Sequence, residues 1–217
     1  MKRPIILHPD PRLKKQSEAV ADLSDELRTL ADDMLESMYA APGIGLAAPQ
    51  VGLLHRLIVL DCVKSDDEKP RPLVMFNPEI VASSDELNVY EEGCLSIPEQ
   101  YADVTRPAEV QVRWIDRDGN EQNETMDGLW ATCVQHEIDH LNGKLFIDHL
   151  KPLKRQMITR KMVKTNNATE EREHEYQSNQ NTASDRSYGR RRRAKYLCPR
   201  HCSRSINRQA DRNLARV

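Results

Sequence analysis

Residues 136–140 read HEIDH, and they lie inside segment 128–142, whose apolar residues recur at helical spacing. Residues four apart lie on one face of a helix, so His136 and His140 can hold one metal ion between them. Glu137 projects beside the same position, where a carboxylate can take a proton from a water molecule that the ion activates. The motif therefore predicts a helix that carries a hydrolytic metal site.

The segments on either side of this helix show helical and strand patterns. Helical spacing extends from Ser24, the expected N-cap, to about Ala40. Gly143 ends the motif helix, and Pro152 opens a last helical stretch to about Val163. Strand patterns fill the middle of the chain, at 56–61, 73–82 and 108–116, with a hairpin turn at 118–119 that continues toward 124. The order of elements predicts an α+β fold in which antiparallel sheets pack around the central motif-bearing helix.

The distribution of charge separates a body from a tail. Residues 1–162 carry 19 Lys and Arg against 28 Asp and Glu, whereas residues 163–217 carry 13 against 6. The tail is rich in polar residues and includes four consecutive arginines at 190–193, a composition typical of disorder. We expect residues 1–162 to form one catalytic domain and 163–217 a basic, disordered tail. The acidic body argues against a specific DNA-binding function.

The start of the chain and its cysteines indicate a cellular compartment. Residues 1–9 contain only three consecutive apolar residues, too few for a signal-peptide core or a membrane span. The chain has five cysteines, an odd number that cannot all pair in disulfides. They are better interpreted as reduced thiols and possible metal ligands. We therefore expect a cytoplasmic protein without a membrane partner.

A catalytic metal site usually takes three protein ligands, so a third must be found. A thermolysin-like site would need a downstream glutamate, but the acidic residues at 170–175 lie in the tail. A metzincin would carry a histidine where this chain has Phe146. Cys94 is the better candidate, between Gly93, which permits a tight turn, and Pro98, which we expect to end a strand. A thiolate is a strong ligand for zinc or ferrous iron.

Three motifs then resemble one known family. They are GIGLAAPQ at 43–50, EGCLS at 92–96 and QHEIDH at 135–140, and their order and content are those of bacterial peptide deformylases. The resemblance covers about residues 1–162. It implies a metal-dependent hydrolase that removes the formyl group from the N-terminal formyl-methionine of newly synthesised polypeptides and releases formate.

The resemblance also implies a role for individual residues. It places the metal ligands at Cys94, His136 and His140, the general acid/base at Glu137, and the stabilisers of the oxyanion at the Gln50 side-chain amide and the Leu95 backbone N–H. The cofactor it implies is one divalent ion, most often Fe²⁺, with Zn²⁺, Ni²⁺ or Co²⁺ as substitutes.

Substrate binding follows from the same resemblance. The slot for the methionine side chain would be lined by Tyr90, Leu129 and Cys133, and the peptide backbone could pair with Ile44, Gly45 and Gly93. Glu92 and Arg106 match an ion pair near Gln50.

The chain departs from the family pattern at two places. Tyr101 stands where many members have an arginine that helps to hold the peptide, which puts peptide affinity in doubt. The family's C-terminal helix, rich in Lys and Leu and implicated in ribosome contact, loses its apolar pattern here near Val163. The ribosome is therefore an open alternative as a partner, besides N-formyl-methionyl nascent peptides.

Two other functions compete with deformylation. A broader metallopeptidase would cleave unformylated peptides, but its usual ligand patterns are missing. A non-enzymatic relative could bind peptides or RNA, although such a protein has no need of Glu137 beside a metal. A second metal site at CPRHC, residues 198–202, is not expected, because three ligands within five residues have no partner pair elsewhere in the tail.

Overall fold

The computed structural model describes residues 1–63, 69–168 and 172. In chain order the elements are the 3₁₀ helix η1 (Pro11–Lys14), α1 (Asp25–Ala40), β1 (Gly45–Ala47), η2 (Ala48–Val51), β2 (Leu57–Leu60), β3 (Leu73–Ser83), β4 (Leu87–Cys94), β5 (Ile97–Pro107), β6 (Glu109–Ile115), β7 (Glu121–Asp127), α2 (Gly128–Leu141) and η3 (Phe146–His149). A further helix covers residues 152–168. Residues up to Met162 form one compact unit. The described residues 163–168 and 172 fall outside it.

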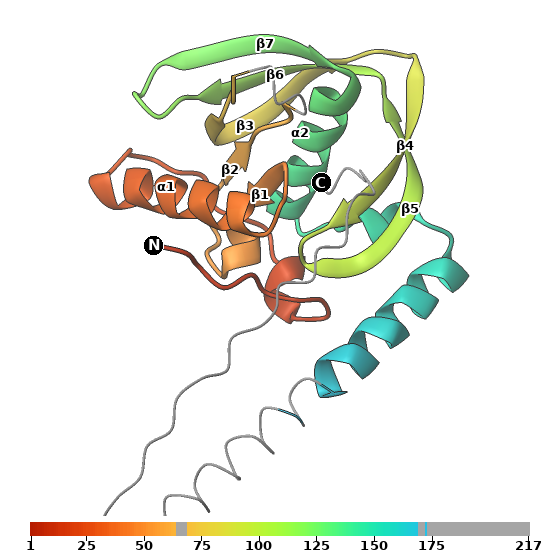
Figure 1. Cartoon of the computed structure of the whole chain (residues 1–217). Coiled ribbons are helices and arrows are strands. Elements are labelled where there is room, and N and C mark those ends of the chain that lie inside the picture. Colours follow the sequence, from red (N-terminus) through yellow and green to blue (C-terminus); the bar gives the residue numbers. More distant parts are fainter. Residues whose placement is uncertain (64–68, 169–171, 173–217) are drawn as a thin grey trace, which may run out of the picture. The chain divides into compact units, whose positions relative to one another are not determined.

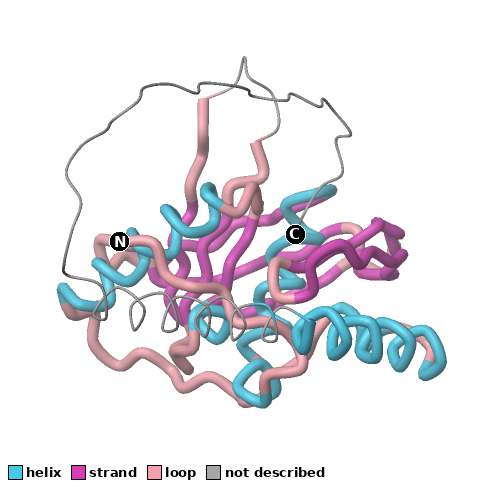
Figure 2. Tube along the Cα trace, turned by 60° about the horizontal axis from the view of Figure 1, so that its bottom comes forward, coloured by secondary structure: helices cyan, strands magenta, loops and turns pink. Residues whose placement is uncertain are grey.

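The strands form two antiparallel sheets around α2. One has five strands in the order β1-β2-β3-β6-β7, and the other is the pair β4-β5. Helix α2 contacts strands of both sheets, so it lies at the seam between them (Figure 1). Figure 2 shows the same arrangement from a second direction, with the helices in cyan against the magenta strands. The predicted α+β fold with a central motif-bearing helix is confirmed.

Strand β2 shows how the core specifies the larger sheet. All four of its residues are buried, and they alternate between two apolar clusters. Ile58 and Leu60 belong to the cluster that includes Ala131, Val134 and other residues of α2. Leu57 and Val59 belong to the cluster formed with α1. A strand that is covered on both faces needs an unbroken apolar run, which explains why the sequence here reads LIVL.

The two central helices begin and end for local reasons. Ser24 caps α1 as predicted, since its Oγ accepts a hydrogen bond from the N–H of Leu27 at 3.4 Å. Gly143 directly follows the C-cap of α2 with a φ of 70°, in the left-handed region that favours glycine. A Cβ at this position would also lie 2.5 Å from the carbonyl oxygen of Lys14. The chain can therefore turn there only with a glycine.

Strands β4 and β5 form a hairpin that the sequence patterns indicated only at its tip. Cys94 pairs with Ile97 across a two-residue turn. The expectation that Pro98 ends a strand is wrong, because Pro98 is the second residue of β5. A proline is tolerated there because β5 pairs with β4 alone, which leaves an edge where no backbone N–H is required.

A third apolar cluster holds this hairpin to the rest of the unit. It joins Cys94 and Val104 to residues of η1 and η3 and to Ile158 and Met162 of the last helix. The helix that begins at 152 is therefore part of the catalytic unit at least to Met162. It is described through residue 168, which is beyond the end predicted near Val163.

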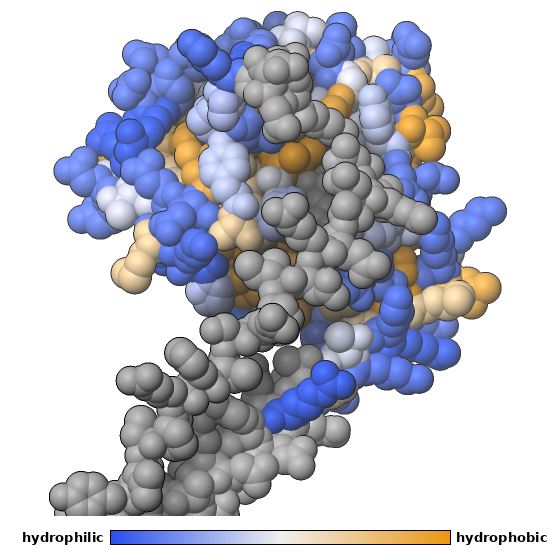
Figure 3. Space-filling view, viewed as in Figure 1, coloured by the Kyte–Doolittle hydropathy of each residue, from blue (hydrophilic) through white to orange (hydrophobic). Residues whose placement is uncertain are grey.

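Polar residues dominate the coloured part of the face shown in Figure 3. Figure 3 shows a mostly hydrophilic face on which apolar residues gather in small areas. Within the described residues, no helix is long and apolar enough to cross a membrane. The expectations for most of the tail, including the residues at 198–202, fall outside the described residues.

Candidate active site

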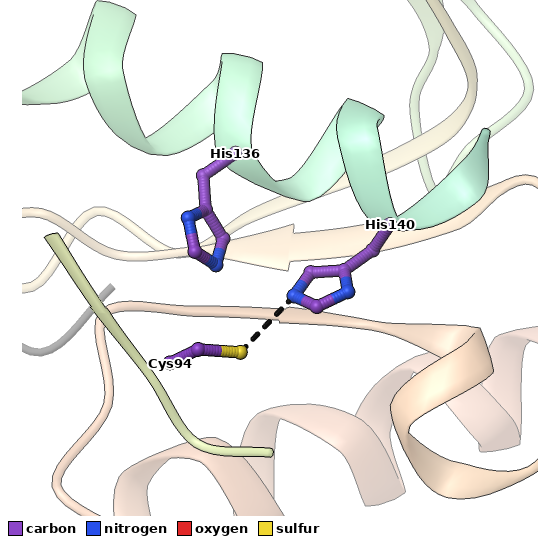
Figure 4. A group of neighbouring side chains, drawn as sticks. All are labelled: Cys94, His136 and His140. Carbon is purple, nitrogen blue, oxygen red and sulfur yellow. Dashed lines mark hydrogen bonds between the residues drawn. The ribbon is translucent and has the colours of Figure 1, made fainter. Parts of the chain in front are cut away.

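Cys94, His136 and His140 meet between the two sheets. Cys94 is the last residue of β4, and the two histidines lie one turn apart on α2 (Figure 4). One ligand atom from each residue lies within 4.8 Å of the other two, and Cys94 Sγ is 3.2 Å from His140 Nε2. All three side chains are buried. In the described part of the chain this is the one group of histidine, cysteine and acidic residues with the geometry to hold a metal ion.

Hydrogen bonds orient the His136 ring. Its Nδ1 lies 2.8 Å from Oε2 of Glu92, so the carboxylate holds the proton on Nδ1. The Nε2 of His136 is buried and has no hydrogen-bond partner among the described residues. Burial, and next the neighbouring His136, lower the pKa of His140 well below its ordinary value, which keeps that imidazole neutral. Both rings can therefore offer a lone pair to a cation.

These residues fit a single metal ion. A cysteine sulfur and two imidazoles are the donor set that zinc and ferrous iron accept. A buried polar atom without a partner is rare, and the unpartnered Nε2 of His136 is explained if a cation is its partner. Burial, and next the charge of Glu137, raise the pKa of the Cys94 thiol, so a cation is also needed to stabilise the thiolate.

Glu137 lies beside this group in an apolar environment. Both of its carboxylate oxygens are buried without a hydrogen-bond partner in the described structure. Burial is the largest cause that raises its pKa well above the ordinary value, followed by the charges of Cys62 and Glu92. A carboxyl group whose pKa has been raised in this way can donate a proton as well as accept one.

Gln50 is held with its amide nitrogen toward the site. Its Oε1 accepts a hydrogen bond of 2.8 Å from the N–H of Ala47, which fixes the orientation of the amide. The Nε2 is then 3.5 Å from Cys94 Sγ and 3.2 Å from Ser96 Oγ. A buried N–H donor thus faces the region next to the sulfur.

Comparison with known proteins identifies the family. The sequence profile of polypeptide deformylases matches residues 2–156. A peptide deformylase of Rhodopseudomonas palustris strain TIE-1 is 58% identical over 163 residues, which are 75% of this chain and 93% of that protein. The chain belongs to the peptide deformylase family.

Solved structures of the family have the same fold. A peptide deformylase from Legionella pneumophila is 46% identical with a TM-score of 0.72, covering 78% of this chain and 98% of that one. One from Ehrlichia chaffeensis in complex with actinonin is 38% identical with a TM-score of 0.72, covering 76% and 97%. The chain is therefore a hydrolase that removes the N-formyl group from nascent peptides, and its Cys-His-His group supports one metal ion.

The residues expected to bind the deformylase substrate fall into two places. Gly45 lies against Glu137 and Cys133, since a Cβ on Gly45 would be 2.4 Å from Glu137 Oε1 and 2.8 Å from Cys133 Sγ. The carbonyl oxygen of Ile44 accepts a weak hydrogen bond from Cys133 Sγ at 3.6 Å, and Leu129 packs against the same apolar cluster. Gly45, Cys133 and Ile44 therefore lie close together near Glu137, and Leu129 packs against the apolar cluster that contains Cys133.

The other predicted residues lie along β4 and the turn that follows it. A Cβ added to Gly93 would lie 2.6 Å from the Tyr101 ring, and one added to Gly128 would lie 3.7 Å from the Tyr90 hydroxyl. The Tyr90 hydroxyl is therefore near Gly128, the first residue of α2 and the one before Leu129 in the sequence. A cavity of about 280 Å³ has Cys94, Leu95 and Tyr101 among its lining residues.

The predicted ion pair between Glu92 and Arg106 is confirmed. Arg106 Nε donates to Glu92 Oε1 at 2.6 Å, and Arg106 Nη2 donates to Glu92 Oε2 at 3.1 Å. Both side chains are buried. Burial raises the pKa of Glu92, but the hydrogen bonds from His136 and Arg106 outweigh it and leave that pKa below the ordinary value. The carboxylate next to His136 is therefore charged.

Sequence reasoning missed several neighbours of the site. Ser96 contacts Gln50, and Cys62 lies near both Cys133 and Glu137. His149 contacts Asp139 of the motif helix. Ser96 lies within the EGCLS motif and could have been singled out, whereas nothing in the spacing of Cys62 or His149 indicated the site.

Proposed function

We propose that Glu137 is the general acid/base of the deformylation reaction and that Cys94, His136 and His140 hold the metal ion. The observation that supports this most directly is the group of unpartnered buried atoms, the Nε2 of His136 and both carboxylate oxygens of Glu137, beside the Cys94 sulfur. Such atoms are costly in a folded protein unless a ligand satisfies them.

In the proposed chemistry the ion and the protein side chains have different roles. A bound divalent ion supplies Lewis acidity, which polarises the formyl carbonyl and activates water. Glu137 takes a proton from the attacking water and delivers it to the peptide nitrogen as formate leaves. The Nε2 of Gln50 and the backbone N–H of Leu95 donate hydrogen bonds to the oxygen on which negative charge develops.

Selectivity for the formyl group follows from the tight packing beside Glu137. The backbone of Ile44, Gly45 and Gly93 pairs with the peptide, and Tyr90, Leu129 and Cys133 line the slot for the methionine side chain. Gly45 packs directly against the Glu137 carboxylate. We propose that this packing leaves too little space beside Glu137 for an acyl group larger than formyl.

The proposed native metal is Fe²⁺. One thiolate and two imidazoles also suit Zn²⁺, Ni²⁺ and Co²⁺, so the ligand set alone does not rank these ions. Metal analysis of protein purified without oxygen, together with formate release after loading with each ion, tests the choice. Equal or higher activity with Zn²⁺, and no iron in the purified protein, would overturn it.

The decisive experiment measures formate release from formyl-Met-Ala and from acetyl-Met-Ala by protein loaded with Fe²⁺ without oxygen. We expect activity on the formyl substrate only. A Glu137→Ala protein should keep its metal but lose about 10²- to 10⁴-fold in kcat, the usual contribution of general acid–base catalysis. Full activity of that variant would contradict the role of Glu137, and metal binding without formate release would favour a non-enzymatic peptide- or RNA-binding protein.

We propose that the catalytic domain ends near Met162 and that the basic tail after it is dispensable for catalysis. Ile158 and Met162 pack in the same apolar cluster as Cys94, which supports a boundary just after them. A chain ending at residue 168 should therefore keep full deformylase activity, whereas a chain ending at 156 should fail to fold. Loss of activity on removal of the residues after 168 would contradict the proposed boundary.

We further propose that the protein works in the cytoplasm and contacts the ribosome, where nascent chains emerge. The segment 151–164 contains six Lys and Arg residues, all exposed, and no acidic residue, which suits a surface rich in phosphate. Co-sedimentation with ribosomes at low and moderate salt tests this. Replacing Lys151, Lys154 and Arg155 by glutamate should abolish binding, and unchanged binding would refute the contact.

A further inference from the structure

His149 is linked to the metal centre although its side chain is 33% exposed. It lies in η3, and its Nε2 is 2.8 Å from Oδ2 of Asp139 in α2. The side chain of Asp139 is 15% exposed. Asp139, which precedes the proposed ligand His140 in the sequence, is therefore hydrogen-bonded to a more exposed histidine of another element.

The same oxygen of Asp139 also accepts a hydrogen bond of 2.8 Å from Nη1 of Arg106. Arg106 uses its Nε and Nη2 to bind the two oxygens of Glu92, and Glu92 Oε2 lies 2.8 Å from Nδ1 of His136. The five side chains form one continuous path of hydrogen bonds. It begins at the surface with His149 and ends at the predicted ligand His136.

Charge balance makes the outer end of this path important. Glu92 and Asp139 are two carboxylates that share the single guanidinium of Arg106, which is 6% exposed. A partly buried carboxylate that loses a donor is left undersatisfied and competes more strongly for the donors that remain. Without the N–H of His149, Asp139 would draw Arg106 toward itself and away from Glu92. The hydrogen bond between Glu92 and the His136 ring would then weaken.

We propose that His149 is a positioning residue for the metal centre, acting through Asp139, Arg106 and Glu92 to fix the orientation of His136. This inference rests on the proposed role of His136 as a ligand. Outer partners of a metal-ligating histidine typically contribute ~10- to 100-fold to metal affinity. Glu92 contacts the ligand His136 directly, whereas three contacts along the path separate His149 from Glu92. We therefore expect a smaller effect of His149 on metal affinity, about three- to tenfold.

The test uses the full chain loaded with Co²⁺. The dissociation constant for Co²⁺ is measured by competition with a chelator, and kcat and KM are measured with formyl-Met-Ala. His149→Leu should weaken Co²⁺ binding about three- to tenfold and lower kcat while KM is unchanged. His149→Gln, which can place an amide N–H near the position of Nε2, should restore both values. His55→Leu is the matched control, since His55 is also partly exposed but makes no ion pair within the described residues.

The outcomes separate this inference from the proposed function. If the unsubstituted protein neither binds Co²⁺ nor releases formate, the proposed function fails. If it does both and His149→Leu binds Co²⁺ equally well with the same kcat, the positioning role is refuted. Thermal unfolding of the metal-free proteins shows whether the substitution acts on the fold. Weaker Co²⁺ binding in His149→Gln as well as in His149→Leu would likewise overturn the role of the N–H donor.

Discussion

Glu92 and His136 are joined by a hydrogen bond of 2.8 Å between a carboxylate oxygen and the ring nitrogen Nδ1. Arg106 binds the same carboxylate from the other side, so Glu92 is held between the guanidinium and the imidazole. A carboxylate behind a histidine fixes the tautomer of the ring and makes its other nitrogen a stronger ligand. The hairpin β4-β5 thereby supplies both Cys94 and the group that orients His136.

Replacing Glu92 by glutamine should weaken metal binding by ~10- to 100-fold, because the amide keeps the shape but loses the charge that strengthens the ligand. Chelator competition with Co²⁺ measures the change. Glu91→Gln is the control, since Glu91 is the exposed neighbour in the same strand. Equal loss of affinity in both variants would show that the effect comes from the strand and not from the contact with His136.

Gly45→Ala, which adds one methyl group, should abolish activity. The added carbon would lie 2.4 Å from Glu137 Oε1 and 2.8 Å from Cys133 Sγ, so the carboxylate must move. A displacement of about 1 Å at a catalytic group costs roughly a hundredfold, so we expect at least that loss in kcat/KM. Gly43→Ala is the matched control, because its added carbon meets only the movable side chain of Leu95. Similar kcat/KM values for the two variants would argue against the placement of Glu137.

Replacing Tyr101 by arginine should improve peptide binding. The Tyr101 ring covers Gly93 and lines the cavity beside Cys94, where many members of the family have an arginine. An additional hydrogen bond of about 1 kcal/mol corresponds to a KM roughly fivefold lower for formyl-Met-Ala-Ser, with kcat unchanged. Tyr101→Leu, which covers Gly93 without offering a donor, should not lower KM. The idea is rejected if both variants change KM equally.

The stability of the protein should depend on Asp148 at neutral pH more than in acid. Burial alone would raise the pKa of Asp148, but hydrogen bonds from Lys14 and from the N–H of Leu145 lower it below the ordinary value of 3.8. Because the folded pKa is depressed, the contribution is complete above about pH 5 and is lost as the pH falls through 3.8 toward the folded value.

Asp148→Asn should therefore lower the free energy of unfolding by about 1 kcal/mol at pH 7, a modest value because the side chain is one quarter exposed. At pH 3, below the ordinary pKa of 3.8, the same substitution should lower it by less. Urea denaturation at the two pH values measures this. Asp103→Asn, at an exposed position of β5, is the control. A loss that is the same at both pH values would mean that the charge of Asp148 does not contribute.

The helices and most strands of the larger sheet could be predicted from sequence because each has a clear period and clear ends. Ser24 and Gly143 mark helix boundaries by local chemistry, and LIVL at 57–60 indicates a strand that is buried on both faces. The three ligands could be proposed because two of them share a helix face. The third ligand, Cys94, is not indicated by periodicity and had to be proposed from the residue types that can bind a metal.

The hairpin β4-β5 could not be predicted in full, for a physical reason. Every second residue of β5 from Ala102 to Arg106 is buried, as in an ordinary strand. The pattern is hard to recognise in the sequence because the third of these buried residues, Arg106, is charged. Arg106 is buried because Glu92 and Asp139 neutralise it, and both lie far from it in the sequence. Strand β1 was missed because three residues are too few to show a period, and the link from His149 to Asp139 exists only once η3 packs beside α2.

The position of α2 at the seam has a consequence for how the protein matures. Its two histidines belong to the helix that covers the five-stranded sheet, whereas Cys94 comes from the two-stranded hairpin. An ion bound to all three would cross-link the two sheets, in the way that a disulfide ties distant segments together. Chain assembly and metal capture would then be a single cooperative event, and a nascent chain that has not yet docked its hairpin would have no site to load.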